Sequence, residues 1–249
     1  MEFITLTKSN IDKEHICCSI ADKKGQCGAA SKKAWLRDRF DEGLVFKKAN
    51  IRGKVFIEYL PAEKAWCPIV APNYMFINCL WVSGQYKGQG YSSLLLDDCI
   101  GDSKSEGKSG IVILSSNKKK PYLADKKYLL HKGFEVCDNA LPYYELMYLT
   151  FDSSTEKPRF NDSVRVEKIK DELGFSIYYS NQCPFCEDYV SAVKRYADDN
   201  NIQLQAIKYE TYEQAQNSPV AWTTYSVFKN GNFITHEILT IDKFKKLVD

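Results

Sequence analysis

A strand that runs through a glycine-rich turn into a helix is the feature that most restricts how this chain can fold. The apolar run Tyr74–Val82 predicts a buried strand, and Gly90–Ile100 carries apolar residues at helical spacing. Gly84 and Gly88 lie in the turn between them. Glycines let a backbone approach a ligand closely, and a helix N-terminus adds unpaired amides and the positive end of the helix dipole. The segment therefore predicts an α/β protein with a pyrophosphate site at this turn.

A polar stretch that ends in proline, Asp152–Pro158, divides the chain into two parts. A length of 249 residues is enough for two domains. We predict a first domain at 1–151, a linker at 152–163 and a second domain at 164–249. Periodicity in the first part predicts strands at 3–7, 54–60, 74–82, 111–114 and 143–151 and helices at 32–42, 90–100 and 123–132. In the second part the predicted order is β-α-β-(α)-β-β-α, with strands at 174–179, 203–207, 225–228 and 232–239 and helices at 186–199 and 241–248.

Composition and charge exclude several classes of protein. Hydrophobic residues make up 44% of the chain and charged residues 27%, which is typical of a folded globular protein. The net charge of +2 is too small for a nucleic-acid-binding surface. The longest apolar stretch is too short to span a bilayer, and the N-terminal sequence lacks the pattern of a signal peptide. We therefore expect a cytoplasmic protein with no nucleic-acid or membrane partner.

Nine cysteines are present, but only Cys183 and Cys186 form a C-x-x-C pair. A structural zinc site needs a second such pair, so we expect no metal. The pair follows a predicted strand and precedes a predicted helix, which favours thiol redox chemistry. Cys183 is expected at the helix N-terminus, where the dipole lowers the thiol pKa, and Cys186 is expected one turn further to resolve a mixed disulfide.

The glycine turn lacks the G-x-G-x-x-G signature of dinucleotide folds and the Lys-Ser/Thr of triphosphate loops. Its sequence Lys87-Gly88-Gln89-Gly90-Tyr91-Ser92 instead resembles the R-G-x-G-x-G/A turn of the GNAT N-acetyltransferase superfamily. A second register, Gln85–Gly90, also matches the superfamily form. The segment Tyr128–Glu135 is similar to the Y-x-x-x-G-F end of the last GNAT helix. The resemblance implies a mixed, mostly antiparallel sheet flanked by helices over residues 1–150.

The same resemblance implies acetyl-CoA as cofactor and a small-molecule or peptide amine as acceptor. It implies that the backbone of Leu80, Trp81 and Val82 pairs with the pantetheine arm. It implies a pyrophosphate site at the turn and a further cofactor contact at the start of the next helix. The residues concerned there are Lys87, Gly88, Gln89, Gly90, Tyr91, Ser92 and Tyr122.

Acyl transfer to an amine needs a base for the ammonium proton and an acid for the leaving thiolate. GNAT enzymes often use a tyrosine as the acid, but the usual position falls on Leu129 in this sequence. Tyr122, Tyr128 and Tyr144 are therefore the candidate acids, and each of them also suits a core or surface role. Glu58, on a strand expected to face the substrate, is the candidate base.

The second part resembles the thioredoxin/glutaredoxin fold, and Phe228–Gly231 is similar to that fold's final hairpin. Thr223 stands where thioredoxins have a cis-proline, so we expect a trans bond there, because a cis bond before a non-proline residue costs about 3–4 kcal/mol. The run Ala221–Phe228 resembles the YoaP-like domain that follows a GNAT domain in YoaP-like bacterial acetyltransferases.

Two functions follow from these resemblances. The first is an acetyl-CoA-dependent N-acetyltransferase with a small thioredoxin-like α/β domain for redox chemistry, binding or regulation. The alternative is a thiol–disulfide redox protein that uses Cys183 and Cys186, with a CoA-binding or sensor GNAT domain. The sequence leaves the acceptor and the oligomeric state open, a homodimer included.

Overall fold

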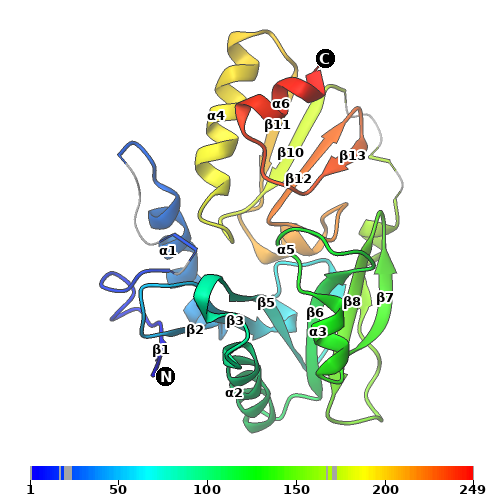
Figure 1. The fold of residues 1–249 in the computed structure, drawn as a ribbon. Coiled ribbons are helices and arrows are strands. Elements are labelled where there is room, and N and C mark those ends of the chain that lie inside the picture. The colour runs from blue at the N-terminus through cyan, green and yellow to red at the C-terminus, as the bar shows by residue number, and fades with distance from the viewer. Residues whose placement is uncertain (1, 17, 20–23, 167, 170–172, 249) are drawn as a thin grey trace.

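The computed structural model describes residues 2–16, 18–19, 24–166, 168–169 and 173–248 (Figure 1). A seven-stranded sheet forms the first part, in the order β1-β2-β3-β5-β6-β8-β7. Only β5 and β6 pair in parallel, and the other neighbours are antiparallel. The strands are β1 (Phe3–Thr5), β2 (Val45–Ala49), β3 (Val55–Pro61), β5 (Tyr74–Val82), β6 (Gly110–Ser116), β7 (Glu135–Ala140) and β8 (Tyr144–Thr150).

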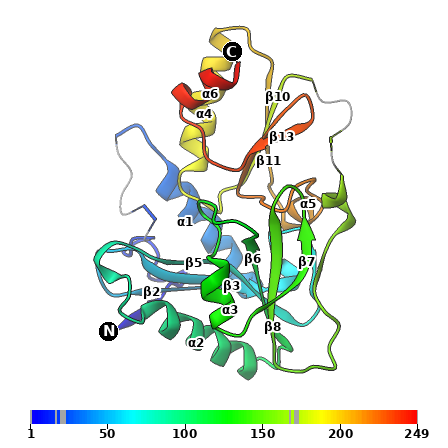
Figure 2. The same cartoon turned by 45° about the vertical axis from the view of Figure 1, so that its right-hand side comes forward.

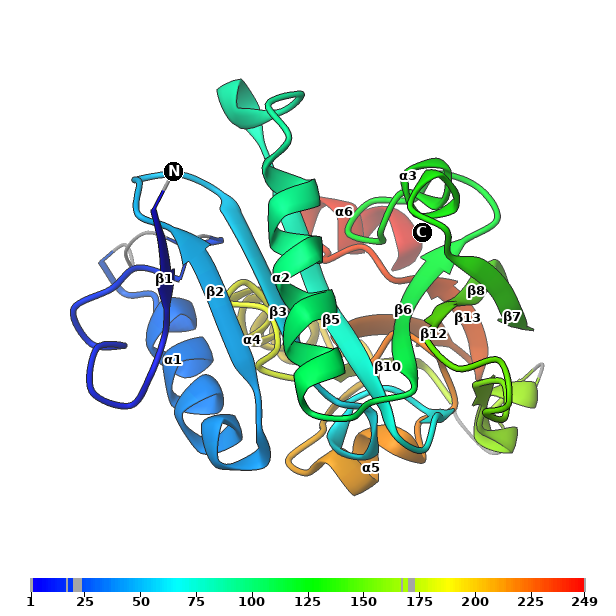
Figure 3. The ribbon, with the colours of Figure 1, turned by 90° about the horizontal axis from the view of Figure 1, so that it is seen from below.

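Helices cover both faces of this sheet. The helices of the first part are α1 (Gly28–Arg39), α2 (Tyr91–Ser105) and α3 (Lys126–His131), with short 3-10 turns at Phe40–Glu42, Ala62–Lys64 and Gly84–Tyr86. Helix α2 lies across one face of the sheet (Figure 3). Its Leu95, Leu96 and Cys99 are buried in one core together with Leu129 of α3. Trp35 of α1 packs in the core on the opposite face. The mixed, mostly antiparallel sheet flanked by helices that the sequence predicts is confirmed.

A four-stranded sheet forms the second part, in the order β11-β10-β12-β13 with β10 and β11 parallel. Its elements are β10 (Phe175–Tyr179), α4 (Cys186–Asp199), β11 (Leu204–Lys208), α5 (Tyr212–Gln216), β12 (Tyr225–Lys229), β13 (Asn232–Thr235) and α6 (Ile241–Val248). This is the β-α-β-α-β-β-α order predicted from the sequence. In Figures 1 and 2, α4 and α6 lie on the outer side of the sheet and α5 lies toward the first part.

One hydrophobic core joins the two parts. Phe76 and Val112 of the first sheet belong to the same buried cluster as Tyr178, Ala221 and Phe228 of the second part. A second, separate core forms between the outer face of the second sheet and its helices α4 and α6. The second part therefore closes the face of the first sheet that lies opposite α2.

The N-terminus of α1 touches α4 across this boundary. The carboxylate of Asp188 accepts hydrogen bonds from the amides of Cys27 (3.0 Å) and Gly28 (3.2 Å), and so caps α1 from the other part of the chain. A Cβ on Gly28 would lie 1.7 Å from the carbonyl oxygen of Pro184, so only glycine fits there. This contact holds the C-x-x-C turn against α1.

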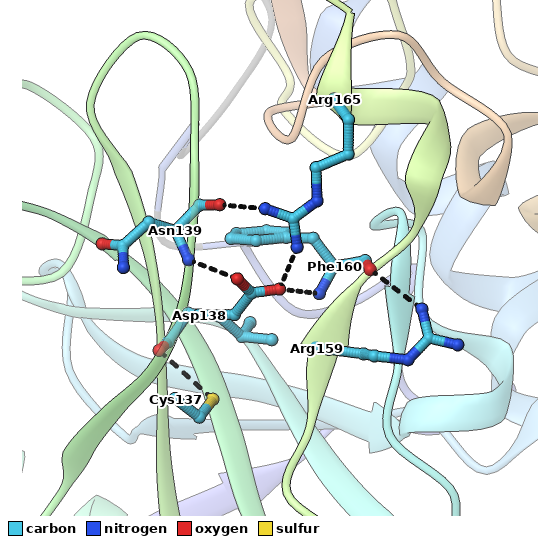
Figure 4. Close-up of polar contacts among 7 residues, drawn as sticks. Cys137, Asp138, Asn139, Arg159, Phe160 and Arg165 are labelled. Carbon is cyan, nitrogen blue, oxygen red and sulfur yellow. Dashed lines mark hydrogen bonds and ion pairs between the residues drawn. The ribbon is translucent and has the colours of Figure 1, made fainter.

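The segment predicted as a linker, 152–163, is fixed to the first part over its second half. It contains β9 (Arg159–Phe160), which pairs with β4 (Ile69–Val70), and runs into a 3-10 turn at Asp162–Arg165. Asp138 of β7 accepts hydrogen bonds from the Phe160 amide (2.7 Å) and from Arg165 (Figure 4). Arg165 also donates to the carbonyl oxygen of Asn139, 2.7 Å away.

Two strands of the first sheet, β2 and β7, were not expected from the sequence. Lys47 and Lys48 interrupt the apolar alternation of β2, although Lys48 is buried and forms an ion pair with Glu14 at 2.9 Å. Helix α1 begins at Gly28, four residues before its predicted start at Lys32.

Replacement of Asp138 by alanine is expected to lower the free energy of unfolding by about 1–3 kcal/mol, because it leaves the Phe160 amide without its acceptor in a largely buried place. Arg159→Ala is the control, since the exposed Arg159 side chain makes only a long contact to its neighbour's carbonyl. Urea unfolding of both variants measures the difference. Equal stability of the two variants would contradict the anchoring role of Asp138.

Candidate functional site

Strands β5 and β6 separate halfway along their length. They pair from Tyr74 and Gly110 to Ile77 and Ile113, where the ladder ends. At this point the register between β3 and β5 shifts, and Asn78 is the extra residue of a bulge. Beyond it, Leu80–Val82 pairs with β3 alone among the described residues. The β6-facing backbone edge of Leu80–Val82 is therefore open to a ligand.

The glycine turn follows directly and presents unpaired amides. Gly88 and Gly90 have φ angles of 75° and 81°, which is the left-handed region that glycine adopts without strain. A Cβ at either position would meet no atom, so the space above the turn is open. Within the described chain, the amides of the five residues from Gly88 to Ser92 have no hydrogen-bond partner. Helix α2 begins at Tyr91, so these amides converge at its N-terminus.

A cavity of about 790 Å³ lies between this turn and the segment that leads into α3. This volume is within the range of small-molecule and cofactor sites. Lys87, Lys119 and Lys120 are among the residues that line it, against the single carboxylate of Asp125, so its lining has an excess of positive charge. Of the cofactor residues predicted from the sequence, all but Gln89 line this cavity, namely Leu80, Trp81, Val82, Lys87, Gly88, Gly90, Tyr91, Ser92 and Tyr122. Gln89 instead turns its side-chain amide back to the carbonyl of Gln85.

A second, smaller cavity of about 130 Å³ lies between the two parts of the chain. Residues of the first sheet line it, and so do residues of the C-x-x-C turn and of the segment before β12. Its polar and sulfur-bearing lining includes Lys32, Glu58, Asn78, Cys79, Tyr122, Gln182 and Cys183. A narrow space of about 30 Å³ at the point where β5 and β6 separate shares Leu80 and Tyr122 with the large cavity, and Asn78 and Cys79 with the small one.

Tyr122 lines all three spaces. Its φ of 68° is a left-handed conformation that a tyrosine rarely adopts. Burial raises the pKa of the Tyr122 phenol, and the nearby Cys183 adds to this effect. The phenol therefore stays protonated at neutral pH and can donate a proton.

The loop that carries Tyr122 is held by the second part. His236 is buried, and its Nε2 donates a hydrogen bond to the carbonyl oxygen of Pro121 at 2.9 Å. Its Nδ1 then accepts a hydrogen bond from the Tyr143 hydroxyl. Burial lowers the pKa of His236, which favours the neutral imidazole that this pair of bonds requires.

Glu58 is buried rather than exposed on its strand. Lys32 donates to both of its carboxylate oxygens, at 2.8 and 2.9 Å, and Asn78 donates to one of them. Lys32 and Glu58, joined in this ion pair, both line the small cavity. Lys32 was not a candidate from the sequence, because the two residues lie 26 positions apart and meet only in the fold.

The structure separates the candidate tyrosines. Tyr128 lines the large cavity, and its hydroxyl is buried without a hydrogen-bond partner among the described residues. Tyr144 was a candidate acid, but it is buried in the core between Tyr143 and His236 and lines none of the three spaces. Leu129 is fully buried in the core beneath α2. We therefore exclude Tyr144 from the site.

The C-x-x-C pair differs in one respect from its prediction. Helix α4 begins at Cys186, so Cys183 lies in the turn before the helix and Cys186 is its first residue. A hydrogen bond from Cys186 and the charge of Lys32 lower the pKa of Cys183, although its burial acts in the opposite direction. Burial raises the pKa of Cys186 well above its usual value, and the Cys186 thiol contacts the carbonyl oxygen of Thr224 at 3.2 Å.

Thr223 has the trans bond expected from the sequence, since the one cis peptide in the described chain joins Leu141 and Pro142. The Thr223 hydroxyl donates to the carbonyl oxygen of Trp66 and accepts from Gln182 at 2.9 Å. This threonine therefore fixes the second part to the first at the edge of the small cavity.

Among the residues that the structure describes, no cluster of His, Cys, Asp or Glu side chains could hold a metal ion, and the Cys17 of the Cys17–Cys18 doublet lies outside these residues. None of the helices in the described ranges has the length and apolar character needed to cross a membrane.

Comparison with known proteins gives a full-length relative. The chain is 47% identical over 249 residues to the protein of Bacillus subtilis (strain 168) named "Uncharacterized N-acetyltransferase YoaP", which covers 100% of this chain and 99% of that one. The YoaP-like family model matches residues 203–246, in the second part of the chain.

Solved structures of acetyltransferases cover part of the chain at low identity. The PaiA N-acetyltransferase of Thermoplasma acidophilum in complex with coenzyme A is 13% identical, with a TM-score of 0.40 over 61% of this chain and 100% of that one. A GNAT-family acetyltransferase of Brucella melitensis in complex with acetyl-CoA is 14% identical, with a TM-score of 0.38 over 63% and 92% of the two chains.

The two pKa directions predict which thiol reacts first. Cys183 has a lowered pKa, whereas that of the exposed Cys27 is raised, because partial burial and the Asp188 carboxylate outweigh a hydrogen bond from Ser31 that lowers it. Alkylation by iodoacetamide requires the thiolate, so the labelling rate of Cys183 is expected to reach its plateau at a lower pH than that of Cys27. Peptide mass spectrometry across a pH series measures both rates, and the reverse order would contradict the thiolate at Cys183.

Proposed function

Because the chain belongs to the YoaP-like N-acetyltransferase family, we propose that it transfers the acetyl group of acetyl-CoA to a primary amine. The observation that carries this proposal is the continuity of the open strand edge with the glycine turn. Both face one cavity of about 790 Å³, whose volume and positive charge suit a long anionic cofactor. The narrow space where β5 and β6 separate shares lining residues with this cavity and with the small cavity that Glu58 lines.

The large cavity suits the cofactor's two chemical parts. The five free amides from Gly88 to Ser92 and the ammonium group of Lys87 would bind the pyrophosphate. The pantetheine arm carries amide groups of its own, and these would pair with the open backbone edge of Leu80–Val82. In this arrangement the thioester lies where β5 and β6 separate, beside Asn78 and Tyr122.

The small cavity suits the acceptor amine. Its walls are largely apolar, and Phe46, Phe56 and Trp222 contribute to them. The carboxylate of Glu58 would attract the substrate's ammonium group and take up its proton. Tyr122, which faces both the thioester and the acceptor, would protonate the leaving thiolate. The unpartnered hydroxyl of Tyr128 would bind the cofactor within the large cavity.

We further propose that the second part is a thioredoxin-like domain that forms one wall of the acceptor site. Its strand and helix order and its C-x-x-C turn before α4 support this assignment. One observation favours the alternative redox function: Cys183 has a lowered pKa beside Cys186, whose pKa is raised. Such a pair is typical of an attacking and a resolving thiol.

Replacement of Gly88 by tryptophan is expected to weaken acetyl-CoA binding at least tenfold (about 1.4 kcal/mol), because the indole would fill the open space above the turn. Gly107→Trp is the matched control, since Gly107 has a similar φ of 68° and open surroundings but does not line the cavity. Calorimetric titration of reduced protein measures both. An intact protein that does not bind acetyl-CoA would refute the transferase function.

Replacement of Tyr122 by phenylalanine is expected to lower kcat by about 10²-fold, because the leaving thiolate loses its proton donor. Tyr128→Phe is expected to raise KM for acetyl-CoA more than it lowers kcat. Thiol release from acetyl-CoA, measured against a panel of primary amines, gives both constants. An unchanged kcat in the Tyr122 variant would assign the acid to another group.

A further inference from the structure

We propose that Cys183 receives the acetyl group from acetyl-CoA as a thioester and then passes it to the amine. This inference rests on the proposed acetyl-CoA function, but it adds a covalent intermediate and gives the second domain a catalytic residue. It rests on the position of Cys183 in the small cavity, on the charges around its sulfur and on the state of its neighbour Cys186.

Position is the first argument. Cys183 lines the same cavity of about 130 Å³ as Glu58, on the side that the second domain contributes. This cavity and the narrow space between β5 and β6 share Asn78, Cys79 and Tyr122 in their linings. A thioester held in the narrow space therefore faces the cavity in which Cys183 and an amine acceptor would both lie.

The residues on both sides of Cys183 are held by packing and hydrogen bonds. Gly28 of α1 packs against the Pro184 carbonyl, the residue after Cys183, with no room for a Cβ. Gln182, the residue before it, is buried and donates hydrogen bonds to Ser180 (2.8 Å) and Thr223 (2.9 Å). The turn is thus held by the first domain after Cys183 and by the second domain before it.

Charge is the second argument. Lys32 lies one helical turn after Gly28 and is nearly fully buried, as is its partner Glu58, with side-chain exposures of 4% and 2%. The ammonium of Lys32 favours the thiolate form of Cys183, while Glu58 acts against it. A thiolate is a stronger nucleophile than the ammonium form of an amine, which has no free electron pair.

The state of Cys186 is the third argument. Its thiol is fully buried against the Thr224 carbonyl, and its raised pKa keeps the proton on its sulfur. Cys186 is therefore the neutral thiol of the pair, and Cys183 is the sulfur whose pKa is lowered. Under reducing conditions the pair behaves as a single nucleophile with a neutral hydrogen-bond donor beside it.

The first step is a thioester exchange. The Cys183 thiolate attacks the carbonyl carbon of acetyl-CoA, the bond from this sulfur to carbon forms, and the bond from carbon to the CoA sulfur breaks. The CoA thiolate takes the phenol proton of Tyr122 and leaves as the thiol. One thioester replaces another, so no oxidant or reductant is needed.

The second step is aminolysis. The substrate ammonium gives one proton to the Glu58 carboxylate, which passes it to solvent. The neutral amine attacks the S-acetyl carbon, the new carbon–nitrogen bond forms, and the bond to Cys183 breaks. The second amine proton returns to the Tyr122 phenolate. Cys183 is left as a thiolate, and Tyr122 and Glu58 are back in their starting states.

The test needs no acceptor, because a covalent intermediate lets the enzyme exchange CoA with acetyl-CoA. The full-length reduced protein is incubated with acetyl-CoA and isotopically labelled free CoA, without amine. We expect the label to enter acetyl-CoA, and we expect peptide mass spectrometry to find one acetyl group on Cys183 that hydroxylamine removes.

Three variants sharpen the test. Cys183→Ala is expected to lose both the exchange and the acetyl group while it still binds acetyl-CoA in a calorimetric titration. Cys27→Ala changes an exposed thiol outside the cavity and is expected to exchange at the wild-type rate. In the Cys186→Ala variant, Cys183 is still expected to become acetylated. A thioester requires one sulfur, whereas disulfide chemistry requires both.

Three outcomes would overturn the inference. Binding of acetyl-CoA with no exchange and no acetyl group on Cys183 would mean direct transfer to the amine, and the proposed transferase function would stand. Equal acetylation of Cys183 and the exposed Cys27 would mean uncatalysed reaction with the cofactor. Absence of acetyl-CoA binding by the wild-type protein would instead refute the proposed function itself, and the inference with it.

Discussion

Packing of the second part of the chain against the first sheet is the interaction on which the small cavity depends. Without it, this cavity would lose the wall that Gln182, Cys183 and Trp222 contribute, and Cys183 would lie apart from Lys32 and Glu58. The contact combines a shared apolar core with hydrogen bonds at its edge, among them those that the Asp188 carboxylate accepts at the N-terminus of α1. Hydrophobic burial supplies most of the free energy of such a contact, and the hydrogen bonds set the relative position of the two parts.

Under the proposed function, the buried Lys32–Glu58 pair serves the reaction rather than the stability of the fold. Moving two charges out of water costs several kcal/mol per ion, and a buried pair of this kind is often no more stabilising than apolar residues of similar volume. Removal of one partner is more harmful, at about 3–5 kcal/mol, because it leaves an uncompensated charge. A protein that needed only a stable core at this place could therefore use two apolar side chains. A pair that lines a cavity beside a thiol offers charge to a reaction.

Features carried by neighbouring residues could be predicted from the sequence, and features assembled across the fold could not. The turn at Gly88 and Gly90 was predictable, because its glycines, strand and helix are adjacent in the chain. Strand β2 was missed, because Lys48 is buried only through its ion pair with Glu14, which periodicity does not reveal. Tyr144 could be placed on a strand, but the packing of the second part against it, through Phe233 and His236, could not be foreseen. The meeting of Glu58 with Cys183 depends on the same docking.

The hydrogen bond between His236 and the carbonyl of Pro121 couples the docking of the second part to the conformation of the loop that carries Tyr122. This bond joins the second part to the loop that lines the large cavity. If a ligand favours this loop in its docked position, it strengthens docking by the same factor by which docking strengthens ligand binding. A substitution that loosens the contact between the two parts would then weaken binding in the large cavity, although it changes no residue that lines it.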